Sequence, residues 1–202
     1  MKTMIFRGRK KRKEVTAAAQ RGLRLIAEGR HEEAYGVLEQ AVQRFPNDPE
    51  IRLHYATTLL AIRPADAVPE VIKAIEMDPD EPIRLTGAAG ILFKMGHIEK
   101  ARSYATHAKG LAPRNFLFMP ELIHLDGHFA ALEGKYELAE ENFCLAAARE
   151  PNNAIFAADL AQFLADRGQK AGALEVIDGA MGRTENKGPL QRLREELLKT
   201  GA

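Results

Sequence analysis

Two histidines stand four residues apart, at His124 and His128. On a helix this spacing puts both imidazoles on one face, where their ring nitrogens can bind one metal ion. Asp126 lies between them but points to another side of the helix. A third ligand could be His54 if the superhelix brought it near. The metalloprotease motif is absent, because no glutamate follows the first histidine. We therefore predict that the chain has no cofactor and that these histidines contact a partner or water. The alternative is that they bind a metal ion, in a metal-dependent enzyme that uses His54, His124 and His128.

No other arrangement of reactive side chains predicts catalysis. The sequence has no Ser-His-Asp order with a nucleophile elbow, no phosphate loop, no dinucleotide fingerprint and no CxxC pair. Its single cysteine, Cys144, cannot form an internal disulfide, and no basic neighbour is evident that would activate the thiol. We predict that the chain is not an enzyme.

The first 13 residues are strongly basic. They hold seven cations and no acid, so the rest of the chain has an excess of acidic residues although the net charge is +1. The cations are Lys2, Arg7, Arg9, Lys10, Lys11, Arg12 and Lys13. Such a cluster can neutralise phosphates of nucleic acid or anionic lipid. We expect residues 1–14 to be a disordered, solubilising tail; weak contact with nucleic acid or lipid through this tail is the alternative.

Hydropathy places few limits on location. No stretch approaches the ~20 apolar residues of a transmembrane helix, and no apolar segment follows the basic residues as in a secretory signal. A cytoplasmic location is the expectation.

A repeated pattern predicts the elements that position these residues. Glycine, four residues and alanine recur at 29–34, 96–101, 134–139 and 168–173, and another alanine follows seven residues later each time. The glycine can end one helix in a left-handed conformation. The two alanines then place small side chains on one stripe of the next helix. Prolines at 46, 79, 113 and 151 close successive units.

These residues and their spacing resemble the tetratricopeptide repeat family over residues 15–186. The resemblance implies an all-α fold: a right-handed superhelical solenoid of about five helix pairs with a C-terminal capping helix. The pairs would span about 15–48, 49–81, 82–115, 116–153 and 154–186, with the capping helix at 187–202.

Two of the expected pairs depart from the pattern. The second has Pro64 and Pro69 at its turn, so we expect a distorted turn and a second helix that starts late. In the fourth, Gly127 competes as the small residue with an apolar stripe, and the register stays open. That stripe is Leu122, Leu125, Phe129 and Leu132.

The resemblance also implies that the first helix of each pair lines a concave groove that binds another protein or peptide. The expected groove residues are Gln20, Leu23, His54, Thr57, Gly87, Gly90, Phe93, Lys94, His124, His128, Asp159 and Gln162. Gly87 and Gly90 could form the floor of a pocket beside Phe93; alternatively, Gly87 relieves crowding between helices. The apolar run Phe116–Met119 is either a homodimer contact or a packed turn. We predict an interaction scaffold or adaptor for a neutral or basic partner segment.

Overall fold

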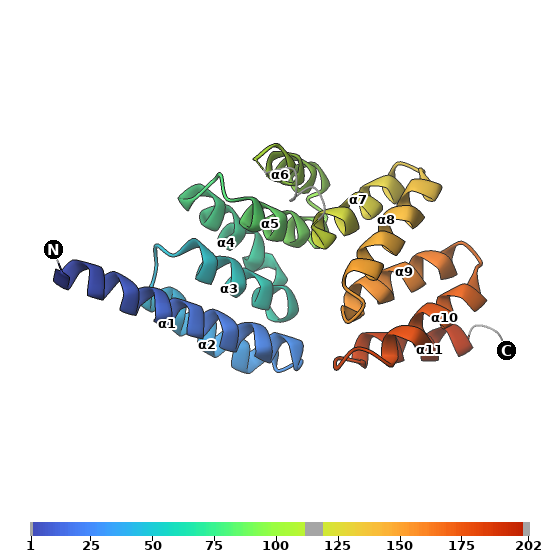
Figure 1. Cartoon of the computed structure of the whole chain (residues 1–202), viewed down its shortest axis with the longest axis horizontal. Coiled ribbons are helices and arrows are strands. Elements are labelled where there is room, and N and C mark those ends of the chain that lie inside the picture. Colours follow the sequence, from blue (N-terminus) through green and yellow to red (C-terminus); the bar gives the residue numbers. More distant parts are fainter. Residues whose placement is uncertain (1, 112–118, 200–202) are drawn as a thin grey trace. The chain divides into compact units, whose positions relative to one another are not determined.

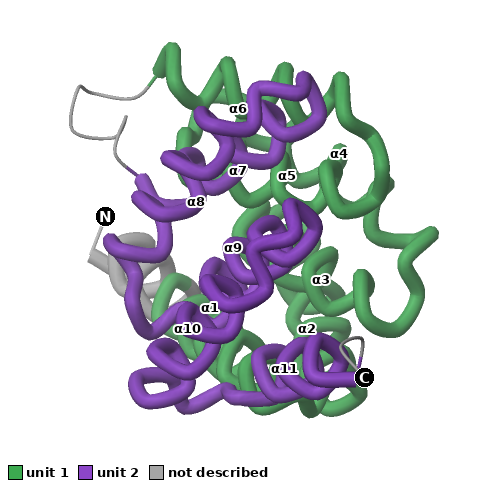
Figure 2. The backbone as a smooth tube through the Cα atoms, turned by 90° about the vertical axis from the view of Figure 1, so that its right-hand side faces the viewer, with its two compact units in different colours: residues 1–112 green, residues 113–202 purple. Residues whose placement is uncertain are grey.

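The computed structural model describes residues 2–111 and 119–199, with side chains from Arg12 onward (Figure 1). This part of the chain contains eleven α-helices and no strand. The all-α fold class is therefore confirmed. The helices divide between two compact units, residues 1–112 and 113–202 (Figure 2).

The first unit is built from three helix pairs. Its helices are α1 (Lys2–Ala27), α2 (His31–Arg44), α3 (Pro49–Ile62), α4 (Pro64–Met77), α5 (Pro82–Lys94) and α6 (Ile98–Leu111). Within the pairs α1 packs on α2, α3 on α4 and α5 on α6, while α2 also contacts α3 and α4 contacts α5. Each pair thus shares its apolar surface with the next, as in a repeat array.

The second unit continues the same pattern over two pairs and a last helix. Its helices are α7 (Pro120–Leu132), α8 (Tyr136–Arg149), α9 (Ala154–Asp166), α10 (Lys170–Met181) and α11 (Gly188–Lys199). The α7–α8 and α9–α10 pairs meet where α8 contacts α9, and α11 packs on both α9 and α10. On α11, Leu190, Leu193 and Leu197 are buried in that contact.

Alanines and glycines allow the paired helices to approach closely. The alanine that begins each small-residue stripe has no exposed surface: Ala34, Ala67, Ala101, Ala139 and Ala173. Two glycines on first helices also allow a close approach to the second helix of the pair. A Cβ added at Gly22 would lie 2.7 Å from Leu38, and one added at Gly127 would lie 2.9 Å from the Phe143 ring. Neither position has room for a larger residue.

The register of the fourth pair is now clear. Gly127 is buried against α8, which identifies it as the small residue of that pair. Leu122, Leu125 and Phe129 are buried too, whereas Leu132 is 60% exposed. The helix buries a wider face than a single stripe, so the two registers considered from the sequence are partly compatible.

Glycines end the first helix in four of the five pairs, as the pattern predicts. Gly29, Gly96, Gly134 and Gly168 have φ between 72° and 77°. This is the left-handed region, where a residue without a Cβ has no steric penalty.

The turn of the second pair is tight, and the expectation that α4 starts late was wrong. Helix α4 begins at Pro64, directly after Arg63, which caps both α3 and α4. Proline suits the first position of a helix because its fixed φ is already helical and no N–H partner is needed there. Pro69 lies inside α4 without ending it.

The basic N-terminal residues differ from the expected disordered tail. Residues 2–14 form the first part of the 26-residue helix α1. Lys, Arg and Glu have good helix propensity, and this segment contains no proline. The helix therefore continues upstream of Val15, the first residue of α1 that is buried among those whose side chains are described.

Candidate functional site

Residues predicted to line a groove lie on the first helices of the pairs, with different degrees of exposure. On α1, Gln20 and Leu23 are exposed. On α3, His54 and Thr57 are half-buried, and the Thr57 hydroxyl donates a hydrogen bond to the carbonyl of Leu53 at 3.1 Å. Since that bond lies within α3, the Thr57 hydroxyl supports its own helix.

His54 is shielded from water on α3. Its side chain is 22% exposed, and its Nε2 lies 4.0 Å from the Oε1 of Glu50. Burial lowers the pKa of this imidazole, although the nearby carboxylates of Glu50 and Asp48 oppose the shift. His54 is therefore neutral at pH 7.

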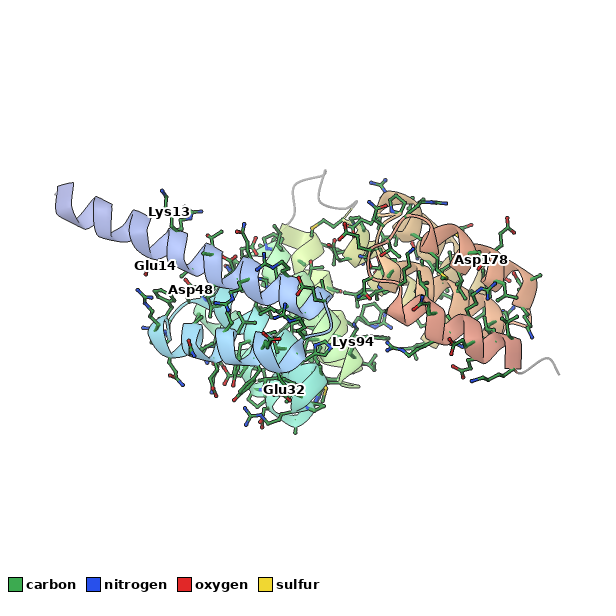
Figure 3. The ribbon with its side chains drawn as sticks, turned by 90° about the horizontal axis from the view of Figure 1, so that it is seen from below. Lys13, Glu14, Glu32, Asp48, Lys94 and Asp178 are labelled. Carbon is green, nitrogen blue, oxygen red and sulfur yellow. The ribbon has the colours of Figure 1, made fainter. Side chains whose placement is uncertain are left out.

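Helix α5 combines a close helix contact with an open position. A Cβ at Gly87 would lie 3.1 Å from the Leu53 side chain of α3. This distance supports the alternative that Gly87 relieves crowding between helices. Around Gly90, by contrast, no atom outside its chain neighbours and the local helix backbone would lie within 4 Å of an added Cβ. Phe93 is half-buried, and Lys94 is exposed at the end of α5 (Figure 3). Of the two glycines on α5, Gly90 is therefore the one with open space beside it.

The second unit brings three predicted groove residues together. His124 and His128 of α7 both approach one carboxylate oxygen of Asp159 on α9. The Oδ2 of Asp159 lies 2.9 Å from the Nε2 of His124 and 3.5 Å from that of His128. We call these three residues the His–Asp cluster. Gln162, one turn further along α9, is exposed and donates a hydrogen bond to Asp166 at 2.7 Å.

Aromatic rings hold the histidines of the His–Asp cluster in place. The ring of Phe156 lies 4.5 Å from the His124 ring, centroid to centroid, in a tilted contact. Phe143 of α8 lies 5.6 Å from His124 and 4.9 Å from His128, both edge-on. Packing of this kind restricts the rotamers of both imidazoles.

The three side chains of the cluster differ in exposure, and the ionised form of the Asp159 carboxyl is favoured. The side chains of His124, His128 and Asp159 are 10%, 26% and 34% exposed. Burial by itself would raise the pKa of the Asp159 carboxyl, but the two histidines that face it outweigh this effect and hold that pKa well below its usual range. Asp159 is therefore an anion at neutral pH.

All three residues are among those predicted to line the groove, but their sequence positions do not predict that they meet. The group that meets the histidine pair is Asp159, and not His54 as expected. A signal was present: positions 124 and 159 are 35 residues apart, close to the ~34-residue repeat length, which places them at equivalent points of successive first helices. The supporting rings Phe143 and Phe156 were not identified.

The remaining sequence-predicted residues belong to the basic tail and to the run before α7. In the tail, Arg12 is exposed on α1, and so is Lys13 (Figure 3). The side chains of Arg7, Arg9, Lys10 and Lys11 lie outside the described residues. Of the Phe116–Met119 run only Met119 is described, at the start of α7. The predicted dimer contact thus stays a prediction.

Cys144 is exposed on α8. The pKa of its thiol is raised, first by the partial burial of the group and second by the negative charge of Glu140. A raised pKa leaves less thiolate at neutral pH, so this environment does not activate the cysteine.

Comparison with known proteins agrees with the helix pairs. A family model described as "Tetratricopeptide repeat" matches residues 25–63, which cover the α2–α3 region. No curated protein matches the sequence significantly. Among solved structures, a thermophilic TPR protein of Thermus thermophilus aligns with a TM-score of 0.74 at 21% identity, over 92% of this chain and 99% of that one.

Two further structures share the fold. PilF of Pseudomonas aeruginosa aligns with a TM-score of 0.60 at 20% identity, covering 95% of this chain and 86% of that one. A tetratricopeptide repeat protein of Parabacteroides merdae aligns with a TM-score of 0.66 at 14% identity, covering 92% of this chain and 72% of that one. The fold is that of an all-α helical repeat array. Residues 25–63 thus match the tetratricopeptide repeat family, and the chain shares the fold of solved tetratricopeptide repeat proteins.

Across residues 2–111 and 119–199, no helix has both the length and the apolar character needed to cross a membrane.

Proposed function

We propose that this chain is an interaction scaffold or adaptor, without catalytic activity, that holds an extended or helical segment of another protein against the first helices of its repeats. The observation that carries the proposal is the open surface at Gly90. Phe93 and Lys94 follow it by three and four residues, which puts all three on one face of α5. A bare backbone, an apolar ring and a cation are thus adjacent.

The glycine at this position has a cost that packing does not explain. Glycine inside a helix is less favourable than alanine by about 0.5–1 kcal/mol. At Gly87 the neighbouring Leu53 accounts for the small residue, but at Gly90 an added methyl would meet nothing. The space above Gly90 supports a contact made by a side chain of another molecule.

The repeat fold supports the same function at a coarser level. Tetratricopeptide repeat arrays in general serve protein–protein interaction. Because alanines and glycines hold the helix pairs together, the larger polar residues of the first helices remain available for binding.

The exposed side chains indicate the chemistry of the partner segment. On the first helices of the second unit, Glu121, Gln162 and Asp166 are exposed and acidic or neutral. Lys94 is the exposed cation at the end of α5. A neutral or basic segment with an apolar anchor for the Gly90 surface fits this set better than an acidic one.

A matched pair of variants tests the proposal. Gly90→Arg places a large side chain on the open surface of α5, and Thr106→Arg places the same side chain on an exposed position of the second helix α6. Peptides selected from a random display library against the wild-type chain would bind Thr106→Arg as well as wild type and Gly90→Arg at least about tenfold more weakly. Equal binding to both variants, with both folded by circular dichroism, would contradict a site on α5.

Salt dependence separates groove binding from recruitment through the basic N-terminal residues. Contacts with phosphates weaken steeply between low and moderate salt, because bound counterions are released. The proposed binding of an apolar anchor should change little over that range. Heparin binding that survives removal of residues 1–13 would exclude the tail as the source of any such contact.

A further inference from the structure

The His–Asp cluster offers three ligand atoms to a common point. The donor atoms of His124, His128 and Asp159 all lie within 4.8 Å of one another, and they form the one such group of three or more among the described residues. Two come from adjacent turns of α7 and the third from α9. The approach therefore depends on the packing of two successive repeats.

Two of the three separations between ligand atoms are close to those found around a small tetrahedral ion. Zinc binds imidazole nitrogen at about 2.0–2.1 Å and carboxylate oxygen at about 2.0–2.2 Å. With tetrahedral angles, ligand atoms bound at these lengths are separated by about 3.3 Å. The separations from Asp159 Oδ2, 2.9 Å to His124 and 3.5 Å to His128, lie on either side of that value.

The surroundings fix the ligands before any ion binds. Phe156 and Phe143 contact the two imidazoles, so little rotamer freedom is left to lose. The carboxylate of Asp159 supplies the negative charge that a divalent cation needs. The cluster is buried at His124 and more accessible at Asp159, which leaves one side open to water.

We propose that His124, His128 and Asp159 form a binding site for a divalent transition-metal ion, with zinc as the best match. Two imidazoles and one carboxylate form a donor set that zinc uses in sites with an open fourth position. Nitrogen-rich sets select zinc, copper, nickel or cobalt over magnesium and calcium, which prefer oxygen ligands alone. The site does not depend on the proposed scaffold function, since its test uses the metal alone.

The test is calorimetric titration of Zn²⁺ into the metal-free, tag-free chain carrying Cys144→Ser, which removes the exposed thiol as a competing ligand. We expect one strong site per chain. His128→Gln and Asp159→Asn should each weaken it by at least about 100-fold, because removing a ligand exceeds the 10–100-fold loss usual for outer-shell changes. Magnesium should not compete.

His107→Gln is the matched control. His107 also faces a carboxylate, with its Nε2 3.3 Å from the Oδ1 of Asp80, but it belongs to no group of three ligands among the described residues. It should bind zinc as the parent does. Absence of a one-to-one site in the parent, or unchanged affinity in His128→Gln, would overturn the proposal.

Cobalt gives a second readout, which reports on the coordination of the metal through its absorption. Co²⁺ bound by two imidazoles and a carboxylate in tetrahedral geometry absorbs strongly in the visible range, whereas the hydrated ion does not. The parent should show this absorption and lose it on addition of one equivalent of Zn²⁺, while His128→Gln should not develop it. An absorption that persists in His128→Gln would place the metal elsewhere.

Discussion

The two units use half-buried polar side chains in different ways. In the first unit, Arg52 of α3 pairs with Glu70 of α4, with side chains only 12% and 14% exposed. Arg52 also donates a hydrogen bond to the carbonyl of Pro46 at 2.7 Å. In the second unit, two histidines of α7 meet one aspartate of α9 among aromatic rings. One arrangement joins helices within a pair and the other joins first helices of successive pairs.

The difference shows how residue type determines what a buried polar contact can do. Arginine is always charged and has no lone pair to offer, so the Arg52–Glu70 pair can only support structure. Histidine can be neutral and can bind a metal through its ring nitrogen. The same repeat scaffold thus supports a structural ion pair in one unit and a potential ligand site in the other.

The largest effect is expected from Phe143→Ala. Phe143 is 2% exposed and contacts both histidines as well as Phe163, 5.3 Å away between ring centroids. Removing a buried phenylalanine costs about 3–5 kcal/mol, because a cavity is left. We expect a loss of that size in the free energy of unfolding, measured by urea denaturation. Phe93→Ala on α5, which removes a half-buried ring, should cost only about 1–2 kcal/mol, and equal losses would contradict the packing described.

Glu70→Gln tests whether the ion pair of the first unit is structural. Burial tends to raise the pKa of Glu70, but hydrogen bonds from Lys73 and Arg52 outweigh it and lower the pKa. The ionised form is therefore stabilised in the folded state. At pH 7 we expect the substitution to cost about 1.5–3 kcal/mol.

The pH dependence of Glu70→Gln follows from the sign of that shift. The stabilisation is present above the unfolded-state pKa of about 4.3 and is lost as the pH falls through the lower folded-state pKa. Wild type and Glu70→Gln should therefore converge in stability at acidic pH, as urea denaturation at several pH values would show. A difference that stays constant from pH 7 to pH 3 would mean that the charge of Glu70 is not responsible.

Two glycine-to-alanine substitutions should have opposite effects on stability. Gly127→Ala adds a methyl 2.9 Å from the buried Phe143 ring and should destabilise the second unit by about 1–3 kcal/mol. Gly90→Ala adds it in open space and should stabilise the first unit by about 0.5–1 kcal/mol. Thermal unfolding of both variants checks the signs. Stabilisation by Gly127→Ala would show that α7 and α8 are not as close as described.

The smallest effect is expected from Asp178→Asn. Asp178 of α10 (Figure 3) pairs with Arg194. The two charged atoms are 2.8 Å apart, but the side chains of Asp178 and Arg194 are 56% and 42% exposed. Exposed ion pairs contribute about 0–1 kcal/mol. The variant should unfold within about 0.5 kcal/mol of wild type in the same urea assay. A loss in the free energy of unfolding as large as that of Glu70→Gln would contradict the expectation that the exposed ion pair contributes less to stability than the buried one.

The sequence predicted the repeat fold because its signals are local. A glycine with positive φ and a seven-residue alanine interval each report on one turn or one helix face, as Gly29 and Ala34 illustrate. The meeting of His124 with Asp159 is different, since it depends on how α7 and α9 cross. Spacing places both residues at equivalent points but does not give the distance between them.

Other features were missed because a local rule competed with a stronger one. Pro64 was interpreted as a disruption, but at the first position of a helix it favours initiation. The basic charges before Val15 suggested disorder, whereas the helix propensity of the same residues extends α1. The two registers of the fourth pair competed because α7 buries a broad face that includes both Gly127 and Phe129.

The junction at Arg63 has a consequence for motion within the first unit. Hinges are residues between elements that can change their backbone dihedrals while both elements stay intact. Here one residue caps both α3 and α4, and its guanidinium lies 4.7 Å from the Tyr35 ring of α2 and donates to the Tyr35 hydroxyl. Bending between α3 and α4 would unwind a helix end and detach this anchor, so this corner should transmit displacement to its neighbours instead of absorbing it.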